Sequence, residues 1–323
     1  MHTEFLSVLI ILTACTVLLT MLDLSVAGLL TWLLRLSFRR CFLWGLLSLL
    51  LPPLLLAYGL LIERNTCQVK HVEIAFNNLP AQFDGYRMVQ LSDIHTRSFL
   101  KRPKALQRCV DKVSNLHPDL VVFTGDIVTL NSSELDSTAH ILGQLHAPDG
   151  VISIIGNHDY CTYGNESNGK QRVVDLERQM GWHVLCNENL ILRHGSDSLA
   201  VVGVENISTS KHFPTTGNLT QALEGTEGMF KILLSHDPTH WDREVVGTDI
   251  PLTLSGHTHA SQFSLLGWTP VRYMYKQYRG LYQKGKQYLY INIGLGETIF
   301  PARIGAPPEI TLITLRRTTA PKA

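Results

Sequence analysis

The chain opens with an apolar stretch about 60 residues long, quite unlike the rest of the sequence. Apolar residues fill two runs, at about 5–34 and 41–62, and Asp23 interrupts the first. Each run reaches the ~20 residues that a helix needs to cross a bilayer core. A cleaved signal peptide fits the first run poorly, because no basic residues precede it and a second run follows. The pattern therefore predicts an N-terminal transmembrane helical hairpin.

Three arginines, Arg35, Arg39 and Arg40, separate the two runs. Positively charged loops tend to stay in the cytoplasm, so the N-terminus and everything after the hairpin are expected on the outer face. We expect an integral membrane protein of the bacterial inner membrane. Asp23 is either an interfacial residue or a polar site inside the membrane. The interfacial position is the one that we favour, because the helix can slide to reach it.

Beyond residue 64 the pattern changes to short β-rich runs that alternate with helical spacing. The expected strands are 69–76, 86–91, 120–124, 151–155, 190–193, 199–204, 231–234, 252–254, 288–291 and 310–315. The expected helices are 103–115, 133–145, 171–180 and 239–245. This order predicts an α/β sandwich of two sheets with outer helices. We therefore divide the chain into a membrane anchor, 1–64, and a globular domain, 65–323.

Composition narrows the function classes. The formal net charge is +1, so bulk charge favours no nucleic-acid partner and none is expected. The 6 cysteines include no CxxC pair, which argues against a zinc knuckle or a disulfide scaffold. The 14 histidines are more informative, because several stand beside Asp or Gly in short blocks.

Polar blocks follow five of the expected strands. The first two are Asp93-Ile94-His95 and Gly125-Asp126. Alternate residues of a strand share a face, so Asp93 and His95 are expected on one side of the strand end. A carboxylate such as Asp126 can bridge two cations, and glycine permits the turn that aims it. Neither block is specific alone.

The remaining blocks are Gly156-Asn157-His158-Asp159, His236-Asp237 and Gly256-His257-Thr258-His259. An Asn carbonyl oxygen suits a divalent metal. Together the blocks supply seven candidate ligands: Asp93, His95, Asp126, Asn157, His236, His257 and His259. With one shared carboxylate they make two four-ligand sites for divalent ions, which Mn, Fe, Zn or Ni would all fit. His158 stands outside these sites and is the candidate group to protonate a leaving oxygen.

The order D-x-H, G-D, G-N-H-D, H and G-H-x-H resembles the calcineurin-like metallophosphoesterase family over about residues 86–300. The resemblance implies an αββα double-sheet core with a dinuclear centre. It places Asp93, His95, Asp126 and His259 on one metal, and Asp126, Asn157, His236 and His257 on the other. It also implies that His158 is the catalytic histidine.

The stretch 293–313, IGLGETIFPARIGAPPEITLI, is similar to a membrane-anchored bacterial branch of phosphodiesterase-like proteins. Some members hydrolyse the pyrophosphate bond of UDP-2,3-diacylglucosamine in lipid A biosynthesis. The resemblance implies a phosphodiester or pyrophosphate substrate that is lipid-linked, as the adjoining membrane anchor also suggests. A phosphomonoesterase or protein phosphatase, and a non-catalytic membrane scaffold, stay as alternatives. Nucleotide-linked lipid A chemistry would need a cytoplasmic site, whereas the arginines place the domain outside.

Two other features stay open at this level. Arg97, after the first block, either reaches a substrate phosphate or is solvated. Segments 206–228 and 262–286 are either lids and lipid-facing loops or ordinary surface. The second segment carries several tyrosines and Trp268 among basic residues, a pattern that suits anionic head groups.

Overall fold

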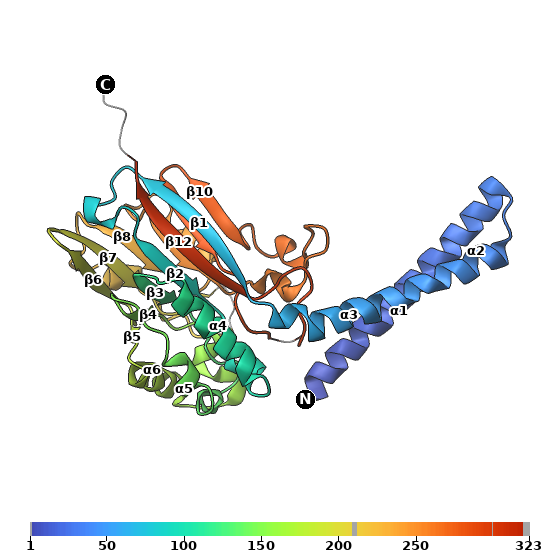
Figure 1. Cartoon of the computed structure of the whole chain (residues 1–323), viewed down its shortest axis with the longest axis horizontal. Coiled ribbons are helices and arrows are strands. Elements are labelled where there is room, and N and C mark those ends of the chain that lie inside the picture. Colours follow the sequence, from blue (N-terminus) through green and yellow to red (C-terminus); the bar gives the residue numbers. More distant parts are fainter. Residues whose placement is uncertain (1, 209–211, 299, 319–323) are drawn as a thin grey trace, which may run out of the picture.

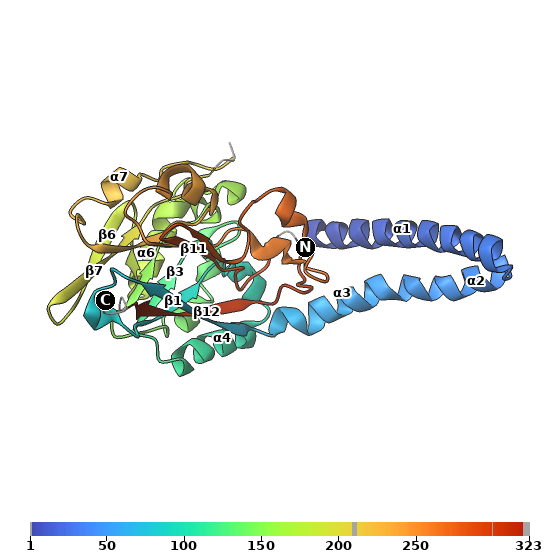
Figure 2. The ribbon, with the colours of Figure 1, turned by 90° about the horizontal axis from the view of Figure 1, so that it is seen from above.

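The computed structural model describes residues 2–208, 212–298 and 300–318 (Figure 1). A helical hairpin projects from one end of a two-sheet domain (Figure 2). Its first leg is α1 (His2–Leu34); its second leg consists of α2 (Phe38–Gly45), a 3-10 stretch (Leu46–Leu50) and α3 (Leu51–Leu61). Length and apolar composition make Val8–Leu34 and Phe38–Asn65 candidate membrane spans, and almost nothing in either is buried within the protein.

Two features of the sequence explain details of the hairpin. Pro52 and Pro53 lie in the first turn of α3, where a missing N–H removes no helical hydrogen bond. Asp23 faces the second leg and accepts a hydrogen bond from the hydroxyl of Ser48 at 2.8 Å. Asp23 is about 16 Å from the end of α1 at ~1.5 Å rise per residue. This distance along the helix does not place Asp23 relative to a bilayer, so the interfacial position stays a prediction.

The globular domain contains two six-stranded sheets. The first sheet has, in spatial order, β1 (Gln68–Phe76), β12 (Glu309–Arg317), β2 (Arg87–Leu91), β3 (Leu120–Phe123), β4 (Val151–Ser153) and β5 (His183–Val184). The second has β10 (Gly280–Lys284), β11 (Gln287–Ile291), β9 (Leu252–Ser255), β8 (Phe230–Leu234), β7 (Asp197–Gly203) and β6 (Glu188–His194). The described helices of this domain are α4 (Pro103–Asn115), α5 (Ala139–Leu142), α6 (Gly169–Gln179) and α7 (Leu219–Ala222).

Three layers of buried apolar side chains hold the sheets and helices together. Between the sheets, residues such as Met88, Val122 and Ile232 form one cluster. Helices α4 and α6 cover the outer face of the first sheet, and α7 with the turn at Trp241–Val245 covers that of the second. The domain is thus the expected αββα sandwich, preceded by two long apolar helices.

Two helix predictions differ from the structure. Residues 133–145 form a 3-10 turn (Ser132–Leu135) and the one-turn α5 instead of one helix. The side chain of Glu134 accepts the backbone N–H groups of Thr129 and Leu130, which holds the chain in a local turn. Residues 239–245 are helical over the predicted bounds, but Trp241–Val245 forms a π-helical turn instead of an α-helical one.

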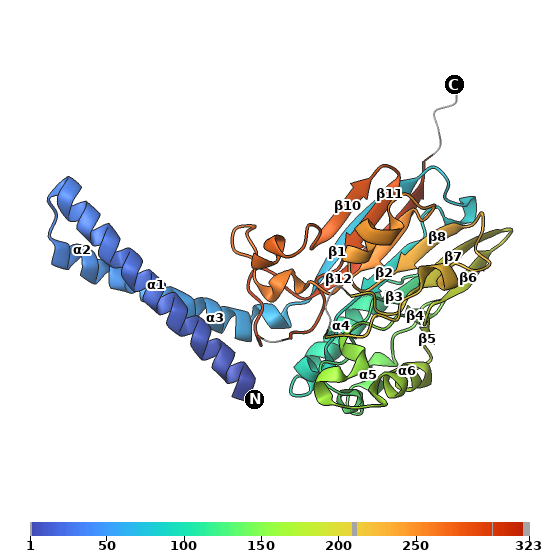
Figure 3. The same ribbon diagram turned by 180° about the vertical axis from the view of Figure 1, so that it is seen from behind.

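The strand directions place the hairpin and the strand ends at one edge. Strands β2, β3 and β4 are parallel, so their carboxyl ends meet. Strand β12 is antiparallel to β2, and β1 is parallel to β12. Strand β1 therefore begins where β2 ends. Since the hairpin runs into β1, it leaves the domain at the edge where the polar blocks lie (Figure 3).

Candidate metal centre

All five polar blocks lie in loops at the carboxyl ends of strands. Asp93 and His95 follow β2, Asp126 follows β3, and Asn157 and His158 follow β4 in the first sheet. In the second sheet, His236 follows β8, and His257 and His259 follow β9. Ligand sites of open α/β sheets form outside this edge. The structure brings residues from both sheets together there, although up to 166 positions separate them along the chain, from Asp93 to His259.

The backbone of these loops is strained. Five candidate ligands have left-handed conformations that non-glycine residues rarely adopt: Asp93 (φ 47°), His95 (44°), Asp126 (61°), His257 (74°) and His259 (49°). Our reasoning that Asp93 and His95 share a face of a strand was therefore wrong, because β2 ends at Leu91 and both residues lie in the following loop. Such strain clusters at functional sites, where the surrounding structure imposes it.

Glycines make room for this crowding. A Cβ on Gly125 would come within 2.5 Å of the Gly156 nitrogen, and a Cβ on Gly296 within 2.0 Å of the Ile94 carbonyl oxygen. Gly125 is the turn glycine that the sequence predicts. The role of Gly296, in the loop after β11, is visible only in the folded chain.

One cluster combines Asp93, His95 and His259, all buried. The Nε2 atom of His259 lies 3.1 Å from Asp93 Oδ1 and 3.1 Å from Nε2 of His95. Asp93 also accepts the backbone N–H of His257 at 2.9 Å, which ties this loop to the second sheet.

A second cluster combines Asp126, His236 and His257. Nε2 of His236 lies 3.1 Å from Asp126 Oδ2 and 3.3 Å from Nδ1 of His257. The same Asp126 oxygen is 3.7 Å from Nε2 of His95, so this carboxylate faces both clusters. Its position suits the shared carboxylate that the sequence suggests.

Backbone carbonyls orient two of the imidazoles. Nδ1 of His95 donates to the carbonyl of Val128 (3.1 Å), and Nδ1 of His236 donates to that of Thr124 (2.7 Å). In the neutral ring the Nε2 atom is then a bare lone pair that points into its cluster. Nε2 of His95 lies 3.1 Å from Nε2 of His259, and Nε2 of His236 lies 3.3 Å from Nδ1 of His257, so a proton or a cation has to lie between the nitrogens of each pair. Outer hydrogen bonds of this kind are typical of metal-ligating histidines.

The pKa values of two cluster histidines follow from burial and from their charged neighbours. Burial lowers the pKa of His95 well below its ordinary value, and the neighbouring rings of His158 and His259 lower it further. This keeps His95 neutral, the form that binds metals. Burial also acts to lower the pKa of His236, but Asp126 outweighs it and raises this pKa to about 10. The second cluster therefore attracts positive charge.

Asn157 lies beside the clusters with an unused acceptor. It is buried, and among the described residues its Oδ1 atom has no hydrogen-bond partner. A buried carbonyl oxygen without a hydrogen-bond partner destabilises the folded state, because it loses its contacts with water and gains no others. A cation next to this oxygen would remove that penalty, so Asn157 fits the ligand set.

His158 is held at the rim of the site. Its backbone N–H donates to Asp126 Oδ1 (2.8 Å), and its Nδ1 donates to the carbonyl of Thr129 (2.7 Å). Its ring stands edge-on to that of His95, with centroids 4.9 Å apart. These contacts leave Nε2 as the nitrogen available for proton transfer.

Asp159 organises the loops from behind the site. It is fully buried and accepts backbone N–H groups from Asp126, Ile127, Val128 and Gly156 at 2.8–3.1 Å. Burial and the nearby Asp126 raise the pKa of Asp159 to about 7, while the N–H groups favour its ionised form. The sequence shows Asp159 in its block without indicating this role.

Other contacts of the site also escape sequence reasoning. The hydroxyl of Tyr275 lies 2.9 Å from Nε2 of His257. The rings of Tyr163 and Phe213 lie 5.3 and 5.8 Å from that of His158 and form an aromatic wall beside it. Phe213 and Tyr275 come from segments 206–228 and 262–286, which the sequence marks as possible lids.

Comparison with known proteins identifies the family. Residues 86–261, more than half of the chain, match the sequence model described as calcineurin-like phosphoesterase. The chain belongs to the calcineurin-like phosphoesterase family. It is therefore a metallophosphoesterase, and the buried His and Asp clusters are consistent with the dinuclear metal site typical of this family.

Relatives within the calcineurin-like phosphoesterases include membrane proteins. An uncharacterized metallophosphoesterase, YkuE of Bacillus subtilis, is 32% identical over 87% of this chain and 98% of its own length. A transmembrane protein with metallophosphoesterase domain from Danio rerio is 34% identical over 87% of this chain, which spans 64% of that relative. The UDP-2,3-diacylglucosamine pyrophosphatase LpxG of Chlamydia trachomatis is 28% identical over 73% of this chain and 86% of its own length. The family resemblance is confirmed, while the bacterial branch stays a prediction.

Proposed function

We propose that this metallophosphoesterase hydrolyses a phosphodiester or pyrophosphate bond in a lipid-linked substrate. Residues 1–64 would anchor the protein in the membrane and 65–323 would carry out the reaction. The observation that carries the proposal is topological: the apolar hairpin and the ligand loops leave the domain at the same edge. UDP-2,3-diacylglucosamine is the first candidate substrate, because LpxG is a relative named for that activity.

We assign the seven polar side chains to two metal positions. Asp93, His95, Asp126 and His259 would hold one divalent ion, and Asp126, Asn157, His236 and His257 the other. Two observations support this assignment: the close pairs of imidazole nitrogens, and the Asn157 oxygen, which has no hydrogen-bond partner within the part of the chain that the structure describes. Bound divalent ions supply a water of lowered pKa and neutralise charge on the phosphoryl oxygens. Mn, Fe, Zn and Ni all suit this mixed N/O donor set.

His158 supplies the proton that the reaction needs. Because its Nδ1 hydrogen is donated to Thr129, the protonated ring can release only the Nε2 proton without losing that bond. A ring nitrogen of His158 lies within 4.8 Å of ligand atoms of His95 and Asp126. A general acid at this position protonates the leaving oxygen as the ester bond breaks. The Asp126 carboxylate fixes the backbone of His158, so the acid and the ligand cannot move apart independently.

An exposed apolar loop supports the lipid-linked substrate. Between β9 and β10, the side chains of Leu266, Tyr273 and Met274 are 101%, 77% and 77% exposed. The loop lies beside α3 (Figures 1 and 3): Phe263 pairs with Ile304, and Ile304 packs against Gly59 of α3. Clustered exposed apolar residues at such a position are typical of surfaces that contact lipid.

The membrane side decides which substrates are available. Positive-inside counting of Arg35, Arg39 and Arg40 supports an outer-face domain. UDP-2,3-diacylglucosamine, a nucleotide-linked lipid, requires the cytoplasmic face. Reporter fusions to the C-terminus, one active only in the cytoplasm and one only outside, separate the two. Activity of the cytoplasmic reporter is required for the UDP-linked candidate, and activity of the external reporter restricts the substrate to lipids exposed outside.

A substrate panel tests the reaction class. The full chain in detergent micelles with Mn²⁺ is given UDP-2,3-diacylglucosamine, bis-p-nitrophenyl phosphate and p-nitrophenyl phosphate. We expect turnover of the lipid substrate and faster hydrolysis of the diester than of the monoester. Preference for p-nitrophenyl phosphate would favour the phosphomonoesterase or protein phosphatase alternative. Release from none of the three with Mn, Fe, Zn or Ni would favour the scaffold.

A further inference from the structure

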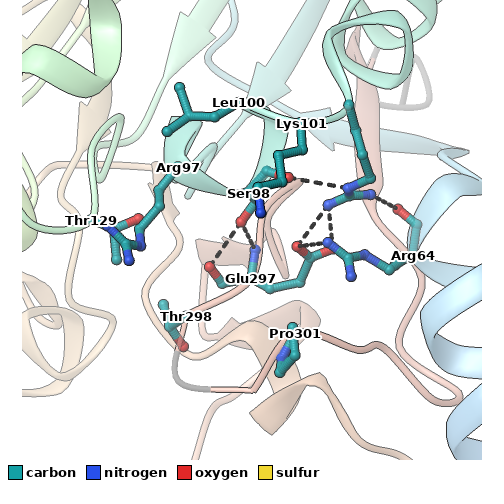
Figure 4. A pocket seen from close by; sticks show the side chains of 10 residues that line it. Arg64, Arg97, Ser98, Leu100, Lys101, Thr129, Glu297, Thr298 and Pro301 are labelled. Carbon is teal, nitrogen blue, oxygen red and sulfur yellow. Dashed lines mark hydrogen bonds and ion pairs between the residues drawn. The ribbon is translucent and has the colours of Figure 1, made fainter. Parts of the chain in front are cut away.

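A cavity of about 510 Å³ is lined by Arg64 at the end of the hairpin and by residues of the loops after β2, β3 and β11 (Figure 4). Its wall carries four basic side chains, Arg64, Arg97, Lys101 and Arg102, and one acidic side chain, Glu297. The formal charge of the lining is therefore positive by three. None of these groups belongs to the seven proposed ligands.

One end of the cavity touches the catalytic residues through Thr129. The carbonyl of Thr129 accepts the Nδ1 hydrogen of His158, and its hydroxyl lies 3.3 Å from Nδ1 of His95. The backbone connects them too, because the 3-10 turn Thr96–Phe99, which includes Arg97, follows His95 directly. The cavity and the candidate metal centre are therefore adjacent through Thr129 and the loop after β2.

The other end of the cavity belongs to the membrane exit. Arg64 lies in the turn Glu63–Asn65 that ends the hairpin, and Arg102 precedes α4. Nη2 of Arg102 donates to both carboxylate oxygens of Glu297, at 3.1 and 2.8 Å, and Arg64 donates to the same carboxylate at 3.3 Å. Glu297 is only 2% exposed, so it is a fixed buried anchor for two guanidinium groups.

Among the described residues that line the cavity, basic side chains outnumber acidic ones. One carboxylate pairs with two largely buried guanidinium groups, and Arg97 and Lys101 add further formal positive charge to the lining. Guanidinium groups bind carboxylates and phosphates through two parallel hydrogen bonds to two oxygens of the anion. An arrangement held in place before the ligand arrives also lowers the cost of binding.

We propose that this cavity binds a second, non-reacting phosphate of the substrate while the scissile phosphoryl group lies at the metal centre. The proposal rests on the function proposed above and adds a chemical requirement to it. A preferred substrate carries two phosphoryl groups, as pyrophosphates do. Arg97 and Lys101 contact the non-reacting phosphate, whereas Arg64, Arg102 and Glu297 shape the inner wall. Of the two alternatives open for Arg97, this one makes it a substrate contact.

The test compares substrates with one and with two phosphoryl groups. The full-length enzyme and its Arg97→Ala and Lys101→Ala variants are assayed on bis-p-nitrophenyl phosphate, UDP-N-acetylglucosamine and UDP-2,3-diacylglucosamine. Each variant is expected to lose at least about tenfold more kcat/KM on the two diphosphates than on the single-phosphate diester, mainly through KM. Lys104→Ala removes an exposed charge outside the cavity and should leave all three activities unchanged. Equal melting temperatures show that the variants are folded.

Each outcome decides the proposal. Equal losses on all three substrates, or no loss on any, would overturn the phosphate subsite while leaving the proposed function intact. Turnover of the diester but of neither diphosphate by the wild type would overturn the subsite and exclude the pyrophosphate substrates, while the phosphodiester part of the proposed function would stand. Hydrolysis of UDP-N-acetylglucosamine but not of UDP-2,3-diacylglucosamine would support the phosphate subsite and exclude the lipid-linked substrate. Activation of diester hydrolysis by phosphatidylglycerol vesicles over phosphatidylcholine vesicles, lost in Arg97→Ala, would assign the cavity to a membrane headgroup and overturn the proposal.

Discussion

The hydroxyl of Tyr275 and the Nε2 atom of His257 are 2.9 Å apart, and Nδ1 is the nitrogen of this histidine that faces the candidate metal centre. If Nε2 donates its hydrogen to Tyr275, Nδ1 carries the lone pair, and Nδ1 is the atom 3.3 Å from His236 Nε2. Burial raises the pKa of Tyr275 to about 12, which keeps the phenol neutral. Tyr275 is thus a positioning residue for His257.

Replacing this tyrosine should weaken metal binding more than folding. We expect Tyr275→Phe to lower the affinity for one of the two metal ions by about 10- to 100-fold, as loss of an outer hydrogen bond does at other sites. The measurement is activity on bis-p-nitrophenyl phosphate against Mn²⁺ concentration, together with bound metal per chain. Tyr273→Phe, at an exposed position of the same segment, is the matched control. Identical Mn²⁺ curves for the two variants would contradict the assignment.

Asn157 and His158 are neighbours in sequence but should fail in different ways. His158→Ala removes the proposed acid and should lower kcat by about 10²–10⁴-fold with both metals retained. Asn157→Ala removes a proposed ligand and should lower both activity and bound metal. Metal analysis of the purified variants separates the two effects. Full activity of His158→Ala would remove its assigned role.

Metal removal should reduce stability as well as activity. Without cations, the paired nitrogens of His95 and His259, and of His236 and His257, lie 3.1 and 3.3 Å apart with only protons to separate them. Ions that bind the folded state alone stabilise it in proportion to the logarithm of their concentration over Kd. We expect a chelator to lower the melting temperature and added Mn²⁺ to restore it. A melting temperature independent of Mn²⁺ would contradict a built metal site.

The segment that carries Phe213 should show a defined pH dependence. Glu205 binds Lys170, Thr216 and Tyr160. Burial acts to raise its pKa, but the hydrogen bonds from Lys170 and Thr216 prevail and the pKa is lowered. A lowered carboxyl pKa contributes stability above the ordinary value, and this contribution is lost as pH falls through the folded value.

Glu205→Gln isolates this contribution. Its melting temperature should lie below that of the wild type at neutral pH, and the two should converge as the pH falls below about 4.5, an ordinary Glu pKa. Thermal unfolding at constant Mn²⁺ between neutral and acid pH measures the difference. A gap that stays constant with pH would show that the charge of Glu205 has no part in stability. Glu188→Gln, on an exposed residue of β6, is the control.

The order of the polar blocks is predictable because parallel strands end at one edge, which brings distant residues together without knowledge of side-chain packing. The backbone conformation of the loops that carry these blocks cannot be predicted in this way. Asp93 and His95 reach the site through left-handed backbone in a loop, and no residue pattern announces that conformation. Strand β10 also escapes prediction, because most of its residues are exposed and it lacks an apolar alternation.

Contacts between particular side chains are also not predictable from the sequence. Tyr275 is one of several tyrosines in its segment, and only the fold shows that it reaches His257. The helix expected at 133–145 has suitable apolar spacing, but side-chain hydrogen bonds of Glu134 override it. Conversely, α4 agrees with its predicted bounds, because its buried residues follow helical spacing against the sheet.

The end of α3 is fixed to the domain by contacts that leave little freedom. Gly59 lies against Arg303 and Ile304, too closely for a Cβ, and Glu63 accepts the backbone N–H of Gly305 at 2.8 Å. With the hairpin in a bilayer, the catalytic loops stand at a set height above the headgroups. Phosphates at that height are within reach and deeper or more distant ones are not. Selection by depth then acts before any recognition of molecular shape.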